Sequence, residues 1–257
     1  MTGYSKQELS QLILEDLTLE QGKLVSREYM TKMNSGDIDS FELEKQYVKK
    51  SGSTIWAKTK VNAVRDSDGS VNYLVELVED ITRERQKALT VRVMNEVAKA
   101  ILGKIDVQEI AWELVNSIGN YLSTDDCVIY ILNQERQELD QIAAYGNKAV
   151  GRTVIDKISI PLGTGIVGTV AKTGVPELIS NTSKDSRYII DDDIRLSELA
   201  VPIFYENEVI GVIDSEHPDE NFYTIENLRT LESISNLVAM QLNNACLLYT
   251  SPSPRDA

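Results

Sequence analysis

The chain has very few of the residues on which most catalytic and metal sites depend. His217 is the only histidine among 257 residues, and histidine is the commonest metal ligand and the usual general base near neutral pH. This scarcity argues against a zinc site, a Ser-His-Asp triad, a Cys-His pair or the phosphoacceptor helix of a histidine kinase. The two cysteines, Cys127 and Cys246, cannot form a disulfide framework, which fits a reducing compartment. We therefore expect no catalytic centre, no metal site and a cytoplasmic location.

Long apolar runs and an excess of positive charge are also missing. No uninterrupted apolar run approaches the roughly 20 residues that a bilayer requires, and no signal segment opens the chain. Lys+Arg total 26 and Asp+Glu total 40, so the formal net charge is −14. Such an acidic surface repels phosphate backbones and anionic lipid headgroups, so we expect no nucleic-acid partner and no membrane contact. The length suits about two globular domains.

The first third of the chain carries the two-residue alternation of β-strands. Glycine-containing turns at 51–53 and 66–69 separate three such runs between Phe41 and Ile81, which predicts an antiparallel meander with one face covered. Before them, Ser5 and Glu8 can form a capping box, so a helix is expected to begin near Ser5. Three strands do not make a closed domain, and we expect an edge of this sheet to lack its partners.

This region resembles the C-terminal part of a PAS domain. The resemblance is carried by four segments, Met1–Leu9, Lys50–Trp56, Asp68-Gly69 and Glu79–Arg85. In that family the Asp-Ile-Thr motif, here Asp80-Ile81-Thr82, closes the last strand and begins the output helix. The resemblance implies that residues 1–85 are the back part of a PAS domain whose first two strands precede residue 1. Its pocket would then be incomplete, and Trp56 is expected to pack on the sheet rather than contact a cofactor.

Residues 86–105 are predicted to form a helical connector. Apolar residues three and four positions apart make a short heptad-like stripe on it: Val91, Met94, Ala98, Ile101 and Ile105. Two interpretations stay open, because the stripe could pair with a second copy of the chain or pack on the following domain. We expect a homodimer that forms through this connector and the terminal helix at Leu228–Ala245.

The rest of the chain, 88–245, resembles a GAF domain. Helical patterns at Val107–Leu122 and Leu228–Ala245 flank a series of strand patterns, namely Cys127–Leu132, Leu139–Ala144, Lys157–Pro161, Glu177–Ser180, Glu198–Tyr205 and Glu208–Ser215. The motifs that carry the resemblance are Pro161–Gly168, Gly174–Pro176, Ser197–Ile203 and Val209–Ser215. The resemblance implies a six-stranded antiparallel sheet with the terminal helices on one face and a small-molecule pocket on the other. The predicted fold class is α+β, with two domains joined by a helix.

One glycine motif matches the dinucleotide fingerprint but is interpreted differently. Gly163, Gly165 and Gly168 have the spacing G-x-G-x-x-G. The preceding run Lys157–Pro161 alternates, whereas the strand before a true fingerprint is continuously apolar, and the following helix must end by Gly174. The glycines therefore indicate a tight strand-to-helix turn. The helix N-terminus there could still help to bind an anionic ligand.

Candidate pocket residues follow from the GAF resemblance. The loop and helix region that borders the pocket in that family contains Arg187, Tyr188, Arg195 and Glu198, and two strand residues, Tyr130 and Asp214, could face the same cavity. Each could instead make an ordinary surface or sheet contact. The nearby run Asp191–Asp193 is interpreted as a solvated loop that caps a helix near Ile194, because three consecutive carboxylates rarely converge on one ion.

The ligand and any cofactor stay unknown at this level. A bilin chromophore needs a cysteine in or near the pocket, whereas Cys127 opens a core strand without a neighbouring histidine. The cyclic-nucleotide signature of the family is matched only imperfectly by Asn181, Lys184, Phe222 and Glu226-Asn227. Residues 246–257 resemble the translation of a sequencing-adapter read-through, so we expect them to be a non-native, disordered tail.

Taken together, the two resemblances predict a sensory fragment of a signal-transduction protein. The GAF domain would bind an unidentified small molecule or mediate dimerisation, and helices would relay its state to a missing output module. In resembling proteins of two-component systems this module is most often a histidine kinase, so the parent protein could be an enzyme. Two alternatives stay open: a GAF-fold enzyme such as a methionine-sulfoxide reductase, which needs reactive cysteines, and a pure dimerisation scaffold.

Overall fold

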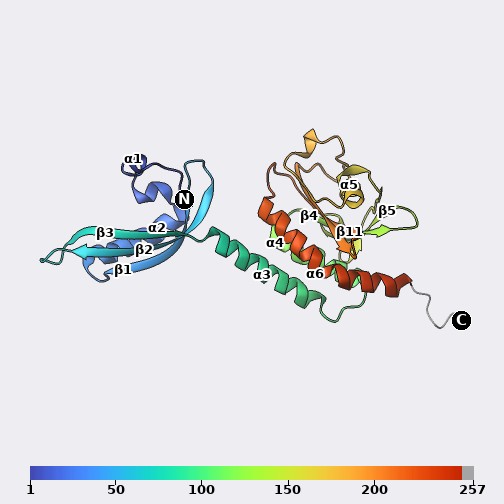
Figure 1. Cartoon of the computed structure of the whole chain (residues 1–257), viewed down its shortest axis with the longest axis horizontal. Coiled ribbons are helices and arrows are strands. Elements are labelled where there is room, and N and C mark those ends of the chain that lie inside the picture. Colours follow the sequence, from blue (N-terminus) through green and yellow to red (C-terminus); the bar gives the residue numbers. More distant parts are fainter. Residues whose placement is uncertain (251–257) are drawn as a thin grey trace. The chain divides into compact units, whose positions relative to one another are not determined.

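The chain divides into two compact units (Figure 1). A computed structural model describes residues 1–250, with the side chains of all of these except Leu14 and 247–250. The first unit is Met1–Leu89 and the second begins at Thr90. The boundary lies inside helix α3 (Thr82–Ile101), so the helical connector predicted from the sequence is confirmed, although it ends earlier than Ile105.

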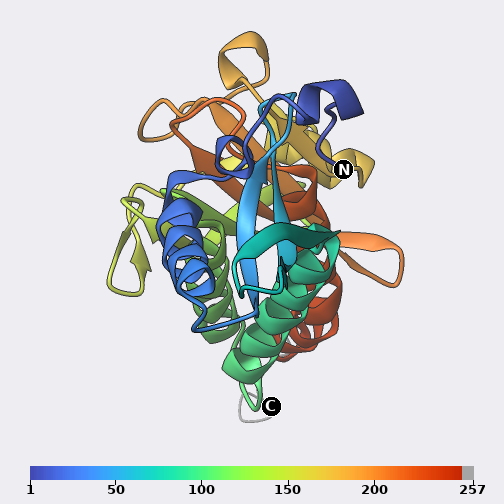
Figure 2. The same cartoon turned by 90° about the vertical axis from the view of Figure 1, so that its left-hand side faces the viewer.

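The first unit is a three-stranded antiparallel meander with one long helix against it. Its elements are α1 (Lys6–Leu9), the 3-10 helix η1 (Leu14–Leu17), α2 (Glu20–Ser35), β1 (Ser40–Val48), β2 (Thr54–Arg65) and β3 (Val71–Asp80). The strand order is β1-β2-β3, and α2 lies along one face of this sheet (Figures 1 and 2). The predicted meander and the capping box of Ser5 and Glu8 are confirmed, whereas α2 was not predicted.

Apolar side chains of the first unit form two separate small clusters. One cluster contains Leu17, Tyr47, Ile55 and Ala57, and the other contains Met33, Phe41 and Val61. Within the described residues β3 pairs only with β2. Tyr73, Val75 and Leu77 alternate along β3 and are all exposed. The predicted edge without partners is therefore the free edge of β3.

The second unit is built on a six-stranded antiparallel sheet. Its helices are the C-terminal part of α3, α4 (Val107–Leu122), α5 (Gly165–Thr173), the 3-10 helix η2 (Thr182–Lys184) and α6 (Ile225–Thr250). The strands of its sheet, in spatial order, are β8 (Ser159–Pro161), β5 (Glu138–Gly146), β4 (Asp126–Asn133), β11 (Glu208–His217), β10 (Ser197–Tyr205) and β9 (Glu177–Ile179). A two-stranded ribbon, β6 (Ala149–Val150) and β7 (Thr153–Val154), projects beside it. This sheet confirms the predicted α+β fold class.

Helices cover the two faces of the large sheet unequally. Figure 1 shows α4 and α6 on one face and α5 on the other. Between α4, α6 and the sheet lies one continuous core that includes Ile118, Ile213 and Leu231, none of which is exposed to solvent. The face beneath α5 carries both apolar and charged side chains, and the candidate site lies there.

Only Ile101 of the connector stripe predicted from the sequence belongs to the buried face of α3. Val93, Val97 and Ile101 pack into the core of the second unit, whereas Val91 is 58% exposed and Ile105 lies beyond the end of the helix. The interpretation that the connector packs on the following domain is therefore confirmed for its C-terminal half, through Ile101 of the stripe and through Val93 and Val97, which the stripe does not contain. The domain, rather than a heptad seam, decides which side of this helix is buried.

The last helix extends beyond its predicted end. α6 runs to Thr250, so the change of composition at Cys246 does not end the helix at Ala245. The part of the predicted tail at 251–257 lies outside the described residues. No helix in the described part of the chain combines the length and the apolar character needed to cross a membrane.

Candidate functional site

Acidic side chains gather on the sheet face beneath α5 because of strand alternation and register. Asp214 and Glu216 are two residues apart on β11 and therefore point to the same face. The register places Glu198 of β10 opposite Glu216, and Asp126 of β4 opposite Glu216 on its other side. All four carboxylates are buried. Charges in such positions are costly unless they are paired or protonated.

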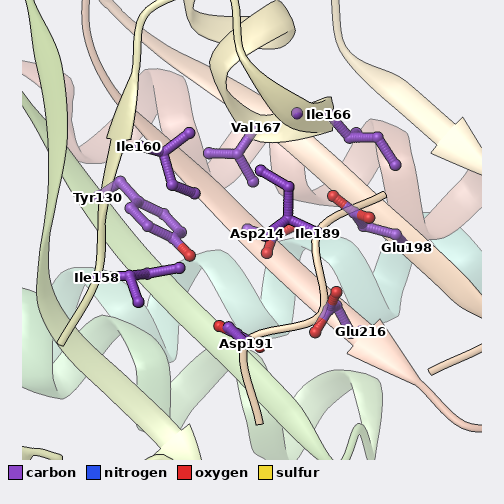
Figure 3. A pocket seen from close by; sticks show the side chains of 11 residues that line it. Tyr130, Ile158, Ile160, Ile166, Val167, Ile189, Asp191, Glu198, Asp214 and Glu216 are labelled. Atoms are coloured by element: carbon purple, nitrogen blue, oxygen red, sulfur yellow. The ribbon is translucent and has the colours of Figure 1, made fainter. Parts of the chain in front are cut away.

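These strands form the floor of a pocket that α5 and a loop cover. The pocket is lined by Tyr130, Ile158, Ile160, Gly165, Ile166, Val167, Ile189, Asp191, Glu198, Asp214 and Glu216. Figure 3 shows the carboxylates and the Tyr130 hydroxyl gathered around one space, with aliphatic side chains beside them. About 310 Å³ of this region, open solvent included, is free of protein atoms. The pocket is narrow, and a guest larger than a water molecule requires the cover to move.

The glycine motif allows the cover to lie this close. Gly165 begins α5 with φ of +68°, and a Cβ atom on it would lie 2.6 Å from Cδ1 of Ile189 in the loop. A Cβ atom on Gly168 would lie 2.6 Å from the carbonyl oxygen of Pro161. A side chain at either position would push the loop or the strand away. The predicted strand-to-helix turn is confirmed, since β8 leads directly into α5.

Lys148 is the main cation beside the pocket. It is 5% exposed, and its Nζ contacts the carboxylate of Asp126, lies 2.7 Å from Asp191 and 3.4 Å from Glu216. Burial opposes the charge, but the carboxylates of Asp126 and Glu216 raise the pKa of Lys148 above its ordinary value. Lys148 is therefore held charged, and it ties the loop at Asp191 to strands β4 and β11.

Arg195 is the second buried cation. Its guanidinium makes two bonds to Asp192, of 2.6 and 3.0 Å, and lies 3.7 Å from both Asp126 and Glu216. Burial opposes ionisation of Asp192, but its hydrogen bonds with Arg195 hold the pKa of this carboxyl well below its ordinary value. Arg195 therefore neutralises the loop more than it neutralises the pocket floor.

The two cations do not balance the carboxylates around them. Six carboxylates belong to the cluster, namely Asp126, Asp191, Asp192, Glu198, Asp214 and Glu216. Burial raises the pKa of Asp214 to about 7. Burial, together with the charge of Asp214, raises the pKa of Glu198 and Glu216 well above their ordinary values. The pocket floor is therefore an acidic surface that keeps protons near neutral pH.

Three polar atoms of the pocket are left open to a partner, and one of them is Oδ1 of Asp191 in the loop. Asp214 is 4% exposed, and none of the described residues donates a hydrogen bond to its Oδ1. The hydroxyl of Tyr130 accepts a hydrogen bond from Nε2 of Gln141 at 3.0 Å, which leaves the hydroxyl hydrogen free to donate. A buried acceptor without a donor is costly, and such atoms in native proteins commonly bind a ligand or water.

The structure brings three of the six predicted site residues together. Tyr130, Glu198 and Asp214 line the pocket. Tyr188 and Arg195 do not line it, since the Tyr188 hydroxyl accepts a hydrogen bond from the backbone N–H of Arg195 and the Arg195 side chain binds Asp192. That these residues bind a ligand stays a prediction.

Arg187 also lies outside the pocket and anchors the loop. Its guanidinium donates to Glu177 at 2.7 Å and to Asp185 at 3.0 and 2.7 Å. Glu177 belongs to β9 at the edge of the sheet, so Arg187 fixes the loop that carries Ile189 and Asp191 over the pocket. Its role is in the geometry of the cover.

The interpretation of Asp191–Asp193 as a solvated cap was wrong. In the described chain no helix begins near Ile194, because the loop leads directly into β10. Asp191 and Asp192 bind Lys148 and Arg195, although Asp192 and Asp193 are both exposed on the loop. Consecutive side chains point apart, and here Asp191 and Asp192 each form an ion pair with a different cation.

Sequence reasoning also missed Asp126, Lys148 and Glu216. Glu216 follows Asp214 by two residues on a predicted strand, so the alternation alone could have placed both on one face. Asp126 stands at the very start of its strand, and Lys148 stands in a short loop. Neither has a local pattern that distinguishes it from a solvated residue.

Cys127 does not face the pocket. It follows Asp126 on β4, points to the opposite face and is fully buried in the core. Burial raises the pKa of this thiol well above its ordinary value, and a protonated, inaccessible thiol is a poor nucleophile. This environment argues against the sulfoxide reductase alternative, which requires a reactive cysteine.

Comparison with known proteins assigns the two units. Residues 1–83 match the PAS domain family and residues 106–242 match the GAF domain family. The probable diguanylate cyclase DgcE of Escherichia coli is 31% identical over 121 residues, 46% of this chain and 11% of that protein. The sensor histidine kinase TmoS of Ectopseudomonas mendocina is 24% identical over 48% of this chain and 13% of that protein.

A third relative is the Nif-specific regulatory protein of Azospirillum lipoferum. It is 24% identical over 61% of this chain and 26% of that protein. The chain thus spans between about a tenth and a quarter of the length of these curated relatives.

Solved structures share the fold of the second unit. The GAF domain of an Acinetobacter phosphoenolpyruvate-protein phosphotransferase has a TM-score of 0.55 at 21% identity, over 64% of this chain and 96% of that one. The free methionine-R-sulfoxide reductase of Neisseria meningitidis, in complex with its substrate, has a TM-score of 0.56 at 16% identity, over 63% and 92%. At these identities the likeness concerns the fold alone. PAS and GAF domains are sensory, so the chain is a sensory piece of a signal-transduction protein. It belongs to the GAF domain family, and its GAF domain follows a PAS domain.

Proposed function

We propose that the GAF domain senses a small molecule in the pocket beneath α5 and relays its occupancy through α6 and α3. One observation carries this proposal, namely the buried Oδ1 of Asp214, which has no donor among the described residues and lies in the wall of the pocket. A folded protein tolerates an unpaired buried acceptor most readily where a bound ligand donates a hydrogen bond to it. The ligand would enter when the loop that carries Ile189 moves.

A direct structural route supports the relay. β10 presents Glu198 to the pocket on one face and packs against α6 on the other, where the Ser235 hydroxyl donates to the carbonyl of Pro202 at 2.6 Å. α6 in turn meets α3, because the hydroxyls of Thr90 and Thr230 lie 3.0 Å apart. A ligand that prefers one position of β10 would bias both helices, provided that its affinity differs between two states.

A ligand screen with a matched variant tests the sensor. Trp56 and Trp112 are the only tryptophans, so in a Trp56→Phe background the emission of Trp112 reports unfolding of the GAF domain alone. We expect at least one small metabolite to raise the unfolding temperature of this domain, and Asp214→Asn to abolish that rise. If no compound raises it at millimolar concentration while the protein is folded, the dimerisation scaffold is the better description.

We further propose a homodimer and a histidine kinase output. The exposed apolar residues Val91 of α3 and Met240 of α6 support pairing of two copies along these helices. The similarity to the sensor histidine kinase TmoS supports a kinase in the parent protein, and the similarity to DgcE supports a diguanylate cyclase as the second candidate. Light scattering on Val91→Glu and Met240→Glu variants, against the wild-type chain, tests the dimer: both should be monomeric.

A further inference from the structure

The floor of the pocket has more negative charge than its surroundings neutralise. Oxygen atoms of Glu198, Asp214 and Glu216 all lie within 4.8 Å of one another, and the three residues are at most 4% exposed. Lys148 is the nearest cation to Glu216, at 3.4 Å, but it also forms ion pairs with Asp126 and Asp191. Within the described residues no cation forms an ion pair with Glu198 or Asp214. A buried site of this composition favours a positively charged guest.

Unused acceptors point to a guest with several donors. Asp214 Oδ1 is buried, lies in the pocket wall and receives no hydrogen bond from the described residues. Glu198 contacts the same carboxyl, and two carboxyl groups can bond to each other only while one carries a proton. An ammonium group has three donors and no acceptor, so it could bond to all three carboxylates at once and replace that proton.

Most of the remaining wall of the pocket is aliphatic, and Tyr130 and Asp191 are its other polar side chains. Ile158, Ile160 and Val167 stand beside the carboxylates, and Ile166 and Ile189 complete this side (Figure 3). A hard divalent cation takes six to eight oxygen ligands, or keeps several of its waters, and the aliphatic side of this pocket offers neither oxygen ligands nor hydrogen-bond partners for such waters. A short alkyl chain, by contrast, would bury apolar surface against these residues.

We propose that this pocket binds a small aliphatic primary ammonium ion, held by the carboxylates of Glu198, Asp214 and Glu216 with its alkyl part against the isoleucines. The inference rests on the proposed function, because it assumes that the pocket beneath α5 is the ligand site. It adds the chemical class of the ligand. It also predicts that binding displaces a proton from the carboxyl pair of Glu198 and Asp214.

The titratable groups around that pair influence its proton. They are Asp126 and Tyr130 from β4, Lys148 from the loop before β6, Tyr188, Asp191, Asp192 and Arg195 from the loop before β10, and Glu216 from β11, while Cys127 and Tyr223 also interact with Asp214. Burial raises the pKa of Asp214 to about 7 despite Lys148. An alkylammonium ion, with a pKa like that of lysine near 10.4, stays charged throughout this range. Affinity should therefore rise with pH while the carboxyl pair loses its proton.

Calorimetric titration of the whole chain with propylammonium chloride tests the proposal. Propan-1-ol and propionate are the neutral and anionic controls of the same size, and magnesium chloride tests for a metal site. We expect propylammonium alone to bind, with an affinity that rises at most about tenfold per pH unit below pH 7, the limit for one displaced proton. The heats measured in two buffers of different ionisation enthalpy should show net release of protons.

Variants locate the site. Asp214→Asn and Glu198→Gln should each weaken binding at least about tenfold, a loss of one charge-assisted contact, whereas Asp193→Asn on the exposed part of the same loop should leave it unchanged. Trp112 emission confirms that each variant is folded. The wild-type comparison of ligands and pH values does not depend on any variant.

The outcomes separate this inference from the proposed function. Equal binding of propan-1-ol, binding of magnesium without propylammonium, or an affinity that does not change with pH would overturn the ammonium assignment. If a neutral or anionic metabolite stabilises the domain and Asp214→Asn abolishes the effect, the sensor proposal stands and this inference falls. If no compound of any charge binds, both fall.

Discussion

Each unit of the chain buries one lysine, and the two lysines have opposite surroundings. In the first unit Lys45 is 8% exposed, donates to the Ser26 hydroxyl at 3.2 Å and lies 5.1 Å from the centre of the Tyr47 ring. In the second unit Lys148 is 5% exposed and lies among carboxylates. Burial lowers the pKa of Lys45, whereas the carboxylates overcome burial and raise that of Lys148. Burial alone therefore does not determine whether a charge is stabilising, because the neighbouring groups decide the sign.

The largest expected effect comes from removing these two charges in turn. Lys148→Met should destabilise the GAF domain by about 3–5 kcal/mol, because it leaves several buried carboxylates without their cation. Lys45→Met should be neutral to within about 1 kcal/mol, since no carboxylate depends on that lysine as closely. Urea unfolding measures both, with Trp112 as the reporter in a Trp56→Phe background and Trp56 in a Trp112→Phe background. Equal losses in the two domains would show that the surroundings do not matter.

The next effect concerns the pH dependence of the GAF domain. The pKa of Asp214 is about 7 when folded, against an ordinary value of 3.8, so the folded state holds a proton that the unfolded state has lost. Its contribution to stability is complete below about pH 4 and declines as the pH rises to about 7, by up to about 4 kcal/mol. Asp214→Asn should remove this decline and so stabilise the domain at neutral pH relative to the wild type.

Unfolding free energies between about pH 4 and pH 8 measure this difference. Glu76→Gln is the matched control in the PAS domain, where burial also raises the pKa of the carboxyl. This substitution should reduce the pH dependence of the unfolding free energy of the PAS domain only. A wild-type and an Asp214→Asn curve that run parallel would contradict the assignment of the proton. If Asp214→Asn both stabilises the domain and abolishes ligand binding, the wild-type carboxyl lowers stability in exchange for ligand recognition.

The smallest effect is expected at the surface of the PAS domain. The guanidinium of Arg85 lies 3.8 Å from the centre of the Trp56 ring and 2.8 Å from Glu44. Arg85→Ala should cost about 0.5–1 kcal/mol, most of it from the ring contact, since exposed ion pairs contribute little. Glu44→Gln is the control and should cost less. Trp56 emission in the Trp112→Phe background should shift for Arg85→Ala alone.

Local signals predicted the elements of the fold well where one face of each element was buried. The alternation of Phe41, Leu43 and Tyr47 predicted β1, and the glycine and proline turns around α5 predicted where that helix begins and ends. Helix α2 was missed because its burial is slight, with only Ser26 and Met33 fully covered. The stripe on α3 was right only at Ile101, because the side of the helix that is buried is the side that contacts the domain.

By itself the sequence determined the two domain families and the order of the main strands of both sheets, since each depends on neighbouring residues and local motifs. The tertiary structure alone decided which charges meet. Asp126, Lys148, Asp191 and Glu216 are far apart in the chain, and each looks locally like a solvated residue. Cross-strand register and the returning loop bring them together, and both depend on contacts between distant segments. Burial then turns ordinary carboxylates into groups that hold protons.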